Sequence, residues 1–545
     1  MSDVQDYDVV IIGAGINGAG LFRDLCEQGL RCLIIDKGDF GSGTSAAPSR
    51  LIHGGLKYLE TGEFGLVAQS TLERNLLLRN APHLVHPLPT VIPIYSWTKG
   101  IWAALRTFFG STTAPRSRGA VLIKIGLRMY DFYGSRSRVM PRHKMITRAR
   151  ALRDIPALTP RIKAVGTYYD AAITGAERLV LELVQDGLTA RPGSKALNWA
   201  DLQSCHQGVL TITASDGSTL RARPRIVVNA AGPWIDSVNA LLGEPTKLIG
   251  GTKGSHILID HPELLRQLDG RMIYFEGDDG RILLVYPYLG KAMVGSTDIP
   301  AQDPDTVLCD DDEIAYFMQS LRDLLPGLSF STDQIVYTYA GIRPLPNSQG
   351  VDPGLISRDH STPELPTTTT RPFPVLSLVG GKWTTFRGFA EEVADGLLQR
   401  LGKPRKVSTR DLPIGGGKGI PHAHARQAWI TDTGAPERAK VLLARYGTTA
   451  RQIIAQEGPK PVLVTGTQDT SRAEIDWIAR NEMVVHLEDI VLRRTQLALT
   501  GQITRAGLDD ICAVAAAALG WDAQRIAEEV QRAAKLLAAR HGVKL

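Results

Sequence analysis

Cysteine is scarce in this chain of 545 residues, with five scattered residues and no CxxC pair. This distribution excludes a disulfide framework and a cysteine-based zinc site, so we predict no metal centre and expect a reducing compartment. Long apolar runs are also missing, because none approaches the roughly 18 uncharged residues that a membrane-spanning helix needs. Any membrane contact is therefore expected to be peripheral.

The N-terminus lacks the parts of a secretory leader, which are a charged start, an apolar stretch and a cleavage site. The first strand of the fold is predicted within ten residues of Met1. We therefore expect no secretory route.

Acidic residues are absent from Arg74 to Tyr130, although the whole chain carries a net charge of only +6. The cations of this segment are Arg74, Arg79, Lys99, Arg106, Arg116, Arg118, Lys124 and Arg128, and the apolar groups among them include Trp97, Ile101, Trp102, Leu105, Phe108 and Phe109. Such a segment suits an anionic lipid surface, where each cation contributes about 1 kcal/mol. The alternatives are a covered subdomain whose cations face water and a nucleic-acid surface, for which no motif is present.

The N-terminal segment has the pattern of a dinucleotide-binding unit. An apolar strand from Tyr7 to Ile12 leads into the turn GAGING (Gly13 to Gly18), then a helix and a second strand that ends at Asp36. Glycines permit a tight turn and close approach to a pyrophosphate at the helix N-terminus. A carboxylate at Asp36 can accept hydrogen bonds from the adenosine ribose hydroxyls.

After Lys37 the chain runs through a Gly/Ser/Thr-rich loop into LIHGGLKYLE, unlike a plain NAD domain. The loop hydroxyls and N–H groups, which come from Thr44, Ser45 and Ser49, can bind phosphate or flavin oxygens, although a polar loop with a helix cap explains the loop alone. If the next segment is helical, His53 and Lys57 share one face. The two glycines between them then allow a bulky ligand close to the backbone.

The chain is longer than a domain with a single hydrophobic core usually is, so two or three domains are expected. From about residue 145 to 370 the chain is predicted to mix strands with loops. IVVNAAGPWID (Ile226 to Asp236) is a buried strand whose small terminal residues suit packing against a cofactor, and KGSHILI, ILLVYPY and AMVGSTDI are strands of a sheet. IVYTYAGIRPL is a further strand with Arg343 at its end.

A second Gly-rich turn, GKWTTFR from Gly381 to Arg387, follows the strand-like PVLSLV more than 360 residues after the first. It indicates a cofactor contacted from both ends of the fold, as in flavoproteins. The helix predicted after the turn can direct its N–H groups and dipole at the flavin pyrimidine. Lys382 would then lie beside the isoalloxazine.

Beyond a linker near Asp411 to Gly419, the chain is predicted to end in an Ala-rich, amphipathic helical tail. This tail contains HLEDIVLRRT (His486 to Thr495), in which we find no catalytic grouping.

The motifs GAGINGAG, TSAAPSRLIHGGLKYLE, VNAAGPW, KGSHI, YAGIRPL, ISRD, GGKWTTFR and HLEDIVLRRT occur in the order seen in FAD-dependent glycerol-3-phosphate dehydrogenases. The chain resembles this family of quinone-linked, D-amino-acid-oxidase-like flavoproteins over nearly its whole length. The resemblance implies an α/β fold: a Rossmann-type FAD domain over 1–405, interleaved with a mixed-sheet substrate domain (roughly 75–175 and 245–345), and a C-terminal all-α domain over 406–545.

The resemblance also implies FAD as cofactor and a polyol phosphate as substrate. It implies peripheral attachment to the cytoplasmic face of the inner membrane, with an anionic lipid surface and membrane quinone as partners, a homodimer, and no nucleic acid.

Oxidation of a secondary alcohol by a flavin requires hydride transfer, removal of the hydroxyl proton and stabilisation of the reduced flavin. His53 is the most natural general base, because its unperturbed pKa is near neutral; Tyr58 and His256 are the alternatives, and His53 can instead pack under the flavin. Arg343 can hold phosphate or the reacting oxygen with its planar fork. Lys382 can polarise the developing carbonyl, anchor the substrate or support the flavin anion.

Phosphate recognition should need two or three cations. Lys57 and Arg358 match positions where the family carries basic phosphate ligands, with Arg343 nearby. The family commonly has arginine at the Lys57 position, and lysine keeps the charge but loses the bidentate fork. The identity of the polyol phosphate therefore stays undecided. A second departure, the bulky Phe22 on the first helix, concerns packing only.

The residues expected to contact FAD lie in the four segments described above. They are Gly13, Gly15, Asn17, Gly18, Asp36, Lys37, Thr44, Ser45, Ser49, Arg50, Leu51, Ala230, Gly232, Gly381, Lys382, Trp383 and Thr384.

The function we predict is oxidation of sn-glycerol 3-phosphate to dihydroxyacetone phosphate, with electrons passed to membrane quinone. The alternatives are the same chemistry on another polyol phosphate, such as a tetritol phosphate, and an oxygen-using oxidase. A different class, a dinucleotide-binding adaptor without redox turnover, is disfavoured because a binding protein needs no base.

Overall fold

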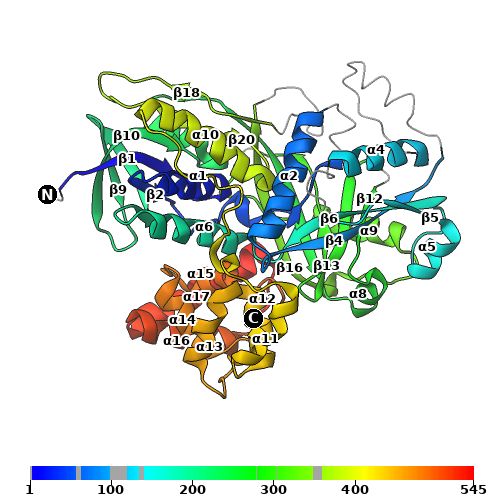
Figure 1. Cartoon of the computed structure of the whole chain (residues 1–545). Helices are drawn as coiled ribbons and strands as arrows, with labels where there is room; N and C mark the ends of the chain where they lie inside the picture. Colours follow the sequence, from blue (N-terminus) through cyan, green and yellow to red (C-terminus); the bar gives the residue numbers. More distant parts are fainter. Residues whose placement is uncertain are drawn as a thin grey trace.

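Two β-sheets and a C-terminal group of helices make up the described part of this computed structural model (Figure 1). The structure describes residues 3–56, 63–97, 119–133, 140–277, 279–301, 303–347 and 359–545. In Figure 1 the first sheet lies on the left, the second on the right and the C-terminal helices below both.

The first sheet is built on parallel strands that are buried on both faces. β1 (Gln5–Ile12) pairs in parallel with β2 (Cys32–Ile35) on one side and with β10 (Thr219–Asn229) on the other. These strands are rich in Val and Ile, as expected for parallel strands with both faces covered. The sheet is completed by β7 (Lys195–Leu197), β19 (Val375–Ser377) and β18 (Glu364–Leu365), and by β8 (Asp201–His206) and β9 (Val209–Thr213) beside β10.

Three helices cover one face of this sheet: α1 (Ile16–Glu27), α6 (Ala176–Ala190) and α10 (Phe386–Leu401). The bulky Phe22 on α1 is fully buried, and Gly187 on α6 makes room for it. A Cβ atom at Gly187 would lie 2.7 Å from the Phe22 ring. The departure noted at Phe22 is therefore compensated on the neighbouring helix. The other face packs on β8, β9 and α7 (Ile235–Leu241).

The second sheet is mixed and has ten strands. Its strands are β15 (Ile299–Pro300), β11 (Ile249–Ile259), β14 (Lys291–Gly295), β13 (Ile282–Tyr288), β12 (Met272–Glu276), β4 (Val85–Ile94), β6 (Ala164–Ile173) and β3 (Leu51–Ile52), with β16 (Ile335–Pro346) beside β11 and β5 (Lys144–Thr147) beside β6. One face packs on α5 (Arg148–Asp154), α8 (Pro262–Leu268) and α9 (Asp311–Leu324).

The opposite face of the second sheet shares a core with the C-terminal helices. Leu258 faces this core, whereas its neighbours Ile257 and Ile259 face α8 and α9, as the alternation of a strand requires. The C-terminal helices are α11 (Ala423–Asp432), α12 (Pro436–Tyr446), α13 (Ala450–Glu457), α14 (Arg472–Asn481), α15 (Leu487–Asp489), α16 (Arg505–Leu519) and α17 (Ala523–His541). At the end of α17, His541 stacks on Tyr337 of β16 with 4.4 Å between the ring centroids.

Two further helices belong to the region of the second sheet. α2 (Phe64–Asn80) lies between the two sheets in Figure 1, and α4 (Ala120–Tyr133) covers the outer part of β6. Within the described ranges, no helix is long and apolar enough to cross a membrane. The predicted fold class is confirmed: a Rossmann-type sheet, a second mixed sheet and a C-terminal helical domain.

Candidate active site

A cavity of about 1570 Å³ lies where the two sheets and the C-terminal helices meet. Most of the residues that the sequence predicts for the site line it: Gly13, Gly15, Asn17, Asp36, Lys37, Thr44, Ser45, Ser49, Arg50, Leu51, His53, Ala230, Gly232, His256, Arg343, Gly381, Lys382, Trp383 and Thr384. Lys57, Tyr58 and Arg358 lie outside the described residues. Gly18 is not part of the cavity wall.

Two of the three fingerprint glycines, Gly13 and Gly18, permit close backbone packing at the end of β1. A Cβ atom at Gly13 would lie 2.5 Å from the carbonyl oxygen of Ala230, at the end of β10. One at Gly18 would lie 2.0 Å from the carbonyl oxygen of Gly13. Gly18 therefore serves the packing of α1 against the turn, and Gly13 brings two strand ends together at the cavity.

Asp36 directly follows β2 at the acidic position of the fingerprint, and backbone N–H groups hold its carboxylate. Ala14 N donates to Asp36 Oδ2 at 2.7 Å, and Gly38 N donates to Oδ1 at 2.9 Å. Burial raises the pKa of the carboxyl to about 6. A carboxylate in this position has remaining lone pairs for ribose hydroxyl donors.

The hydroxyls of the loop after β2 have partners within the protein. Ser45 Oγ accepts from Ile16 N at 2.9 Å, so it caps the start of α1. Thr44 Oγ1 donates to the carbonyl of Ile342 at 2.6 Å. These bonds fix the loop against both α1 and β16, so the helix-cap interpretation applies to Ser45 even though it also lines the cavity.

Arg50 carries a buried ion pair that the sequence pattern did not indicate. Both Nη atoms bind the carboxylate of Glu177 at 2.6 Å, and Nη2 also donates to Ala46 O at 3.2 Å. Arg50 has a φ of 55°, a conformation that costs free energy in a residue with a side chain. Because Glu177 is 127 residues away in the first turn of α6, no local motif could reveal this pair.

His256 lies fully buried in the cavity wall. Its Nε2 is 2.7 Å from Ser49 Oγ, and its ring stacks on Tyr339 with 4.8 Å between centroids. Gly295 leaves space for the ring, because a Cβ atom there would lie 2.1 Å from it. Burial lowers the pKa of His256 well below its usual value, and the charges of Arg343 and Arg50 lower it further. His256 is therefore neutral at pH 7.

Arg343 is oriented by the loop after β14. Nη1 donates to Asp298 Oδ1 at 2.9 Å, and Nη2 donates to Ser296 Oγ and to the carbonyl of Thr297, both at 3.1 Å. The guanidinium passes directly over Gly254 of the KGSHI motif, where a Cβ atom would lie 2.3 Å from Nη2. This explains the glycine in KGSHI.

The second Gly-rich turn delivers Lys382 to the cavity. Gly380 and Gly381 have φ values of 74° and 84°, which favour glycine. The side chain of Lys382 is almost fully buried, and its Nζ donates to Ser70 Oγ on α2 at 3.1 Å. The turn then continues through a short 3₁₀ segment (Trp383–Thr385) into α10.

His53 follows β3, and residues 53–55 form no helix; Lys57, the residue predicted to share a helical face with His53, lies outside the described residues. A buried cluster supports this segment. Gly54 N donates to Tyr130 Oη at 2.9 Å and to Asp170 Oδ1 at 3.0 Å. Arg74 Nη1 donates to the same two atoms, at 2.7 and 3.1 Å, and the Tyr130 hydroxyl also binds Asp170.

This cluster corrects one expectation, that Arg74 belongs to a basic surface. Arg74 is buried, and its guanidinium forms an ion pair with the buried carboxylate of Asp170. An isolated buried cation costs so much free energy that a carboxylate partner is required.

Among the described residues, the buried polar atoms of the cavity wall that have no hydrogen-bond partner include Asn17 Oδ1, His256 Nδ1 and Trp383 Nε1. Buried polar groups are rarely left without a partner. The atoms belong to the fingerprint turn, the second sheet and the second Gly-rich turn, so they surround the cavity from both ends of the fold. The wall therefore fits a long polar cofactor of the FAD type.

The comparisons with known proteins agree with this geometry. Residues 8–394 match the family of FAD dependent oxidoreductases, and residues 407–526 match the C-terminal domain of alpha-glycerophosphate oxidase. The chain is 33% identical to a glycerol-3-phosphate dehydrogenase of Synechocystis sp., with 96% of this chain and 95% of that protein covered. It is 31% identical to a glycerol-3-phosphate dehydrogenase of Pseudomonas aeruginosa, with coverages of 90% and 92%.

Among solved structures, the glycerol-3-phosphate dehydrogenase from Bacillus halodurans complexed with FAD superposes with a TM-score of 0.74 at 21% identity, covering 99% of this chain and 95% of that one. This likeness shows a common fold over the whole chain. Together with the family matches, it confirms the cofactor and the family inferred from the motifs: the chain belongs to the FAD-dependent oxidoreductases, and within them to the glycerol-3-phosphate dehydrogenases.

Proposed function

We propose that this protein oxidises sn-glycerol 3-phosphate to dihydroxyacetone phosphate and passes the electrons to membrane quinone. The observation that carries the proposal is the convergence of Arg343, Lys382, His53 and His256 on one cavity together with the FAD fingerprint. Relatives that are named glycerol-3-phosphate dehydrogenases and align over nearly the whole chain support the choice of substrate.

FAD, when bound, accepts the hydride from the carbinol carbon. The chain must supply a cation for the substrate, a base for the hydroxyl proton and a charge beside the flavin. Arg343 is the cation, because its fork is already fixed by Asp298 and Ser296 before substrate arrives. Lys382, which the second Gly-rich turn positions, supplies the positive charge beside the reactive ring of the flavin.

The base we propose is His53. His256 is held neutral by its low pKa, and a base whose pKa lies far below the working pH takes up protons poorly. We assign His256 to hydrogen bonding at the substrate, with its ring position fixed by Ser49 and Tyr339. Lys57 and Arg358 bind the phosphate in this proposal, and Tyr58 is a further substrate-binding residue.

A visible spectrum of the purified protein, titrated anaerobically with glycerol 3-phosphate, tests the reaction. Bleaching of the flavin band is expected, and a flavin band that glycerol 3-phosphate leaves unchanged would sink the proposal. The same titration with a tetritol phosphate separates the rival substrate, since the better substrate bleaches the flavin faster. Peroxide released in proportion to substrate would instead favour an oxygen-using oxidase.

The surface of α4 supports a membrane acceptor. Val121, Ile125 and Phe132 are 45%, 52% and 73% exposed and fall on one side of the helix, because their spacing returns to the same face every 3.6 residues. Lys124 and Arg128 are exposed on the same side. A helix face with large apolar groups flanked by cations is typical of binding in the plane of an anionic membrane.

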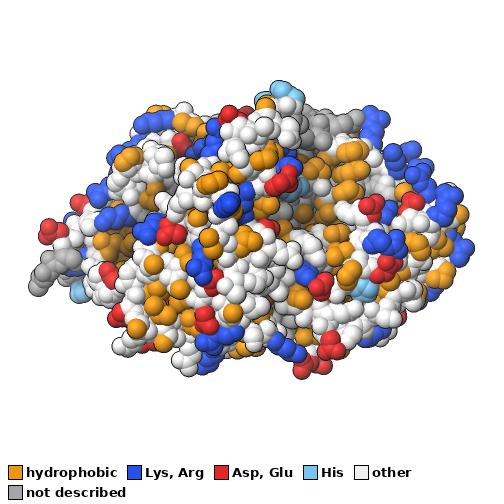
Figure 2. Space-filling model, turned by 90° about the horizontal axis from the view of Figure 1, so that it is seen from below, with side chains coloured by type: hydrophobic (Ala, Val, Ile, Leu, Met, Phe, Trp, Pro, Cys, Tyr) orange, Lys and Arg blue, Asp and Glu red, His pale blue; other side chains and the backbone are white. Residues whose placement is uncertain are grey.

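Basic residues extend this surface beyond α4. Figure 2 shows Lys and Arg side chains gathered at the end of the molecule where α4, α5 and β5 lie in Figure 1. The exposed cations of this region are Arg142, Lys144, Arg148, Arg150, Arg153, Arg161 and Lys163. Within the predicted basic segment, Arg74 is internal, Arg79, Lys124 and Arg128 are exposed, and Lys99, Arg106, Arg116 and Arg118 lie outside the described residues.

Cosedimentation with vesicles that contain anionic lipid tests this surface. The double variant Ile125→Glu/Phe132→Glu should lose binding, because two carboxylates replace the apolar face. Val462→Glu is the matched control, since Val462 is 63% exposed on the C-terminal domain and should be unaffected. Equal binding of all three proteins would contradict the assignment. The homodimer expected from the family stays a prediction, which sedimentation velocity can test.

A further inference from the structure

Asp39 lies three residues after Asp36, and two arginines of the C-terminal domain bind it. The Asp39 side chain is fully buried and accepts from Arg493 Nε at 2.5 Å and from Arg494 Nη1 and Nη2 at 2.6 and 2.8 Å. These residues are more than 450 positions apart in the sequence. The arginines belong to HLEDIVLRRT, in which the sequence showed no catalytic grouping.

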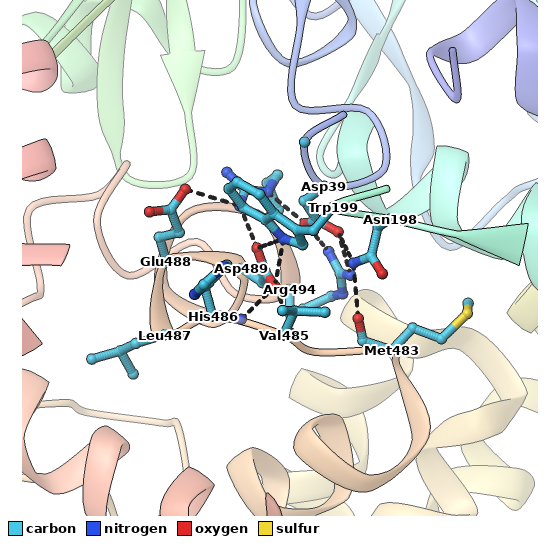
Figure 3. A network of polar contacts seen from close by, with 12 residues as sticks. Asp39, Asn198, Trp199, Met483, Val485, His486, Leu487, Glu488, Asp489 and Arg494 are labelled. Atoms are coloured by element: carbon cyan, nitrogen blue, oxygen red, sulfur yellow. Dashed lines mark hydrogen bonds and ion pairs between the residues drawn. The ribbon is translucent and has the colours of Figure 1, made fainter. Parts of the chain in front are cut away.

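The backbone of HLEDIVLRRT has an unusual form. After α15, residues Ile490–Arg494 form a π-helical turn, and such turns occur frequently at functional sites. Asp489 begins the same network: its Oδ1 accepts from Arg493 Nη2 at 2.6 Å. Figure 3 shows the Asp39 and Arg494 side chains directed toward each other from opposite domains.

A second segment of the FAD domain is bound by the same part of the C-terminal domain. Asn198 Nδ2 donates to Asp39 Oδ1 at 2.9 Å and to the carbonyl of Met483 at 3.0 Å. The indole Nε1 of Trp199 donates to the carboxylate of Asp489 at 3.2 Å, and its ring packs edge-on against His486 (Figure 3). Residues 483–494 therefore bind two loops of the FAD domain at once.

These two loops form the adenosine end of the cavity wall. Trp199 N donates to Gly38 O and Ala200 N donates to Asp36 O, both at 2.8 Å. Asp36, Lys37, Gly38, Trp199 and Ala200 all line the cavity. Asp39, Arg494 and Asp489 do not line it. Arg493 of the same network does line it, together with Glu488. Asp39, Asp489 and Arg494 thus stand behind the wall and support it, whereas Arg493 is part of the wall itself.

The ion pairs also make the arrangement dependent on the C-terminal domain. Asp39 is fully buried, and removing a partner from a buried charge is strongly destabilising. If residues 483–494 withdrew, Asp39 would have to move toward water, and the chain from Asp36 to Gly43 would move with it. The position of Asp36 is therefore coupled to docking of the C-terminal domain.

We propose that residues 483–494 of the C-terminal domain are positioning residues of the FAD site: through Asp39 and Trp199 they set the affinity for FAD. This goes beyond the proposed reaction, because it concerns retention of the cofactor and holds for any substrate. Coupling free energies between sites usually amount to a 5- to 150-fold change in affinity, so an effect of about tenfold or more is expected.

The variant Arg494→Gln tests the proposal, because Arg494 is buried behind the wall and is absent from it. Its matched control is Arg438→Gln. Arg438 binds the buried carboxylates of Glu457 and Glu474 in a network that stays within the C-terminal domain. Both variants remove one cation from buried carboxylates, but only the first weakens the link between the C-terminal domain and the cofactor loop.

The measurement is the dissociation constant of FAD for the apoprotein, followed by the quenching of flavin fluorescence. We expect Arg494→Gln to raise this constant at least about tenfold and Arg438→Gln to leave it unchanged. At saturating FAD, the KM for substrate should be the same in both variants. Equal FAD affinities in the two variants would overturn the proposal.

Hydrogen exchange in the wild-type protein provides a second test that needs no variant. Coupling is reciprocal, so FAD must stabilise the docked C-terminal segment as much as docking stabilises bound FAD. Amides of residues 483–494 should exchange more slowly with FAD than without it. Protection confined to the fingerprint turn and the Asp36 loop would contradict the coupling.

Discussion

Lys382 and Ser70 meet across 312 residues of sequence, with Lys382 Nζ donating to the Ser70 hydroxyl at 3.1 Å. One turn further along α2, Glu73 binds Arg387 through two hydrogen bonds of 2.9 and 2.6 Å. α2 therefore holds the second Gly-rich turn at two successive points. The ammonium of Lys382 enters the cavity with its position determined by a helix that carries no predicted site residue.

We expect Lys382→Met to lower the rate of flavin reduction by about 100-fold, the usual cost of removing one stabilising group at a developing charge. FAD should remain bound, because the fingerprint turn is untouched. Anaerobic stopped-flow bleaching measures the rate. Ser70→Ala keeps the ammonium and should be affected far less; an equal loss in the two variants would show that the lysine acts only through the structure of the turn.

Gly254→Ala should raise the KM for glycerol 3-phosphate without weakening FAD binding. The added Cβ would lie 2.3 Å from Arg343 Nη2, so the guanidinium must leave its place beside Asp298. Steady-state kinetics and a flavin titration measure the two effects. Gly396→Ala is the control, because its Cβ would meet nothing within 4 Å, and alanine there should only favour the α10 helix. An unchanged KM in Gly254→Ala would remove Arg343 from the substrate site.

The affinity for FAD should fall in mildly acidic solution. Burial raises the pKa of Asp36 to about 6, and ribose hydroxyls donate better to the ionised carboxylate than to the protonated one. Protonation between pH 7 and pH 5 should therefore weaken FAD binding by up to about tenfold. Fluorescence titrations at the two pH values measure this. Asp36→Asn should bind FAD more weakly, with no such pH dependence; a dependence that survives in this variant would point to another group.

His541 should make the protein less stable in acid. Its imidazole stacks on Tyr337, its Nδ1 donates to the carbonyl of Thr338 at 2.9 Å, and burial lowers its pKa to about 4. Because this folded-state pKa lies below the unfolded value near 6.5, the unfolded chain binds the proton first, and stability is lost as the pH falls from 6.5 toward 4.

Urea unfolding at pH 7 and pH 5 checks this expectation. His541→Gln should reduce the loss of unfolding free energy between the two pH values by about 2 kcal/mol. His424→Gln, at an exposed histidine, should not change the loss. Equal pH dependence in wild type and His541→Gln would assign the acid sensitivity to other groups.

The sequence predicted those parts of the site whose chemistry is local. The fingerprint turn, the end of β16 at Arg343 and the turn at Gly381 each follow from a strand, small residues and one functional side chain in a short stretch. The hydrophobic period of a strand and the position of a glycine in a turn depend on neighbouring residues, so a sequence pattern reveals them. Apart from Gly18, the predicted residues of these three segments line the cavity, whereas their catalytic roles stay predictions.

The missing parts are pairings between distant segments. Glu177 under Arg50, Asp170 under Gly54 and Asp39 under Arg494 are single acidic residues without a surrounding motif. Each of these acidic residues pairs with a cation or an N–H group that folding buries. Because burial is a property of the whole fold, no short stretch of sequence reveals such a pair. Arg74 shows the same limit: the absence of nearby acidic residues in the sequence says nothing of Asp170, which lies beside it in space.

The stacking of His541 on Tyr337 has a consequence for synthesis. The two segments are separated by about 200 residues, with 203 between Thr338 and its partner His541. At typical translation rates of about 5 to 20 residues per second, β16 leaves the ribosome on the order of 10 to 40 s before its covering helix exists. During that interval the apolar face of the second sheet is uncovered, so a nascent chain is most open to chaperones, and to aggregation, just before its C-terminal domain emerges.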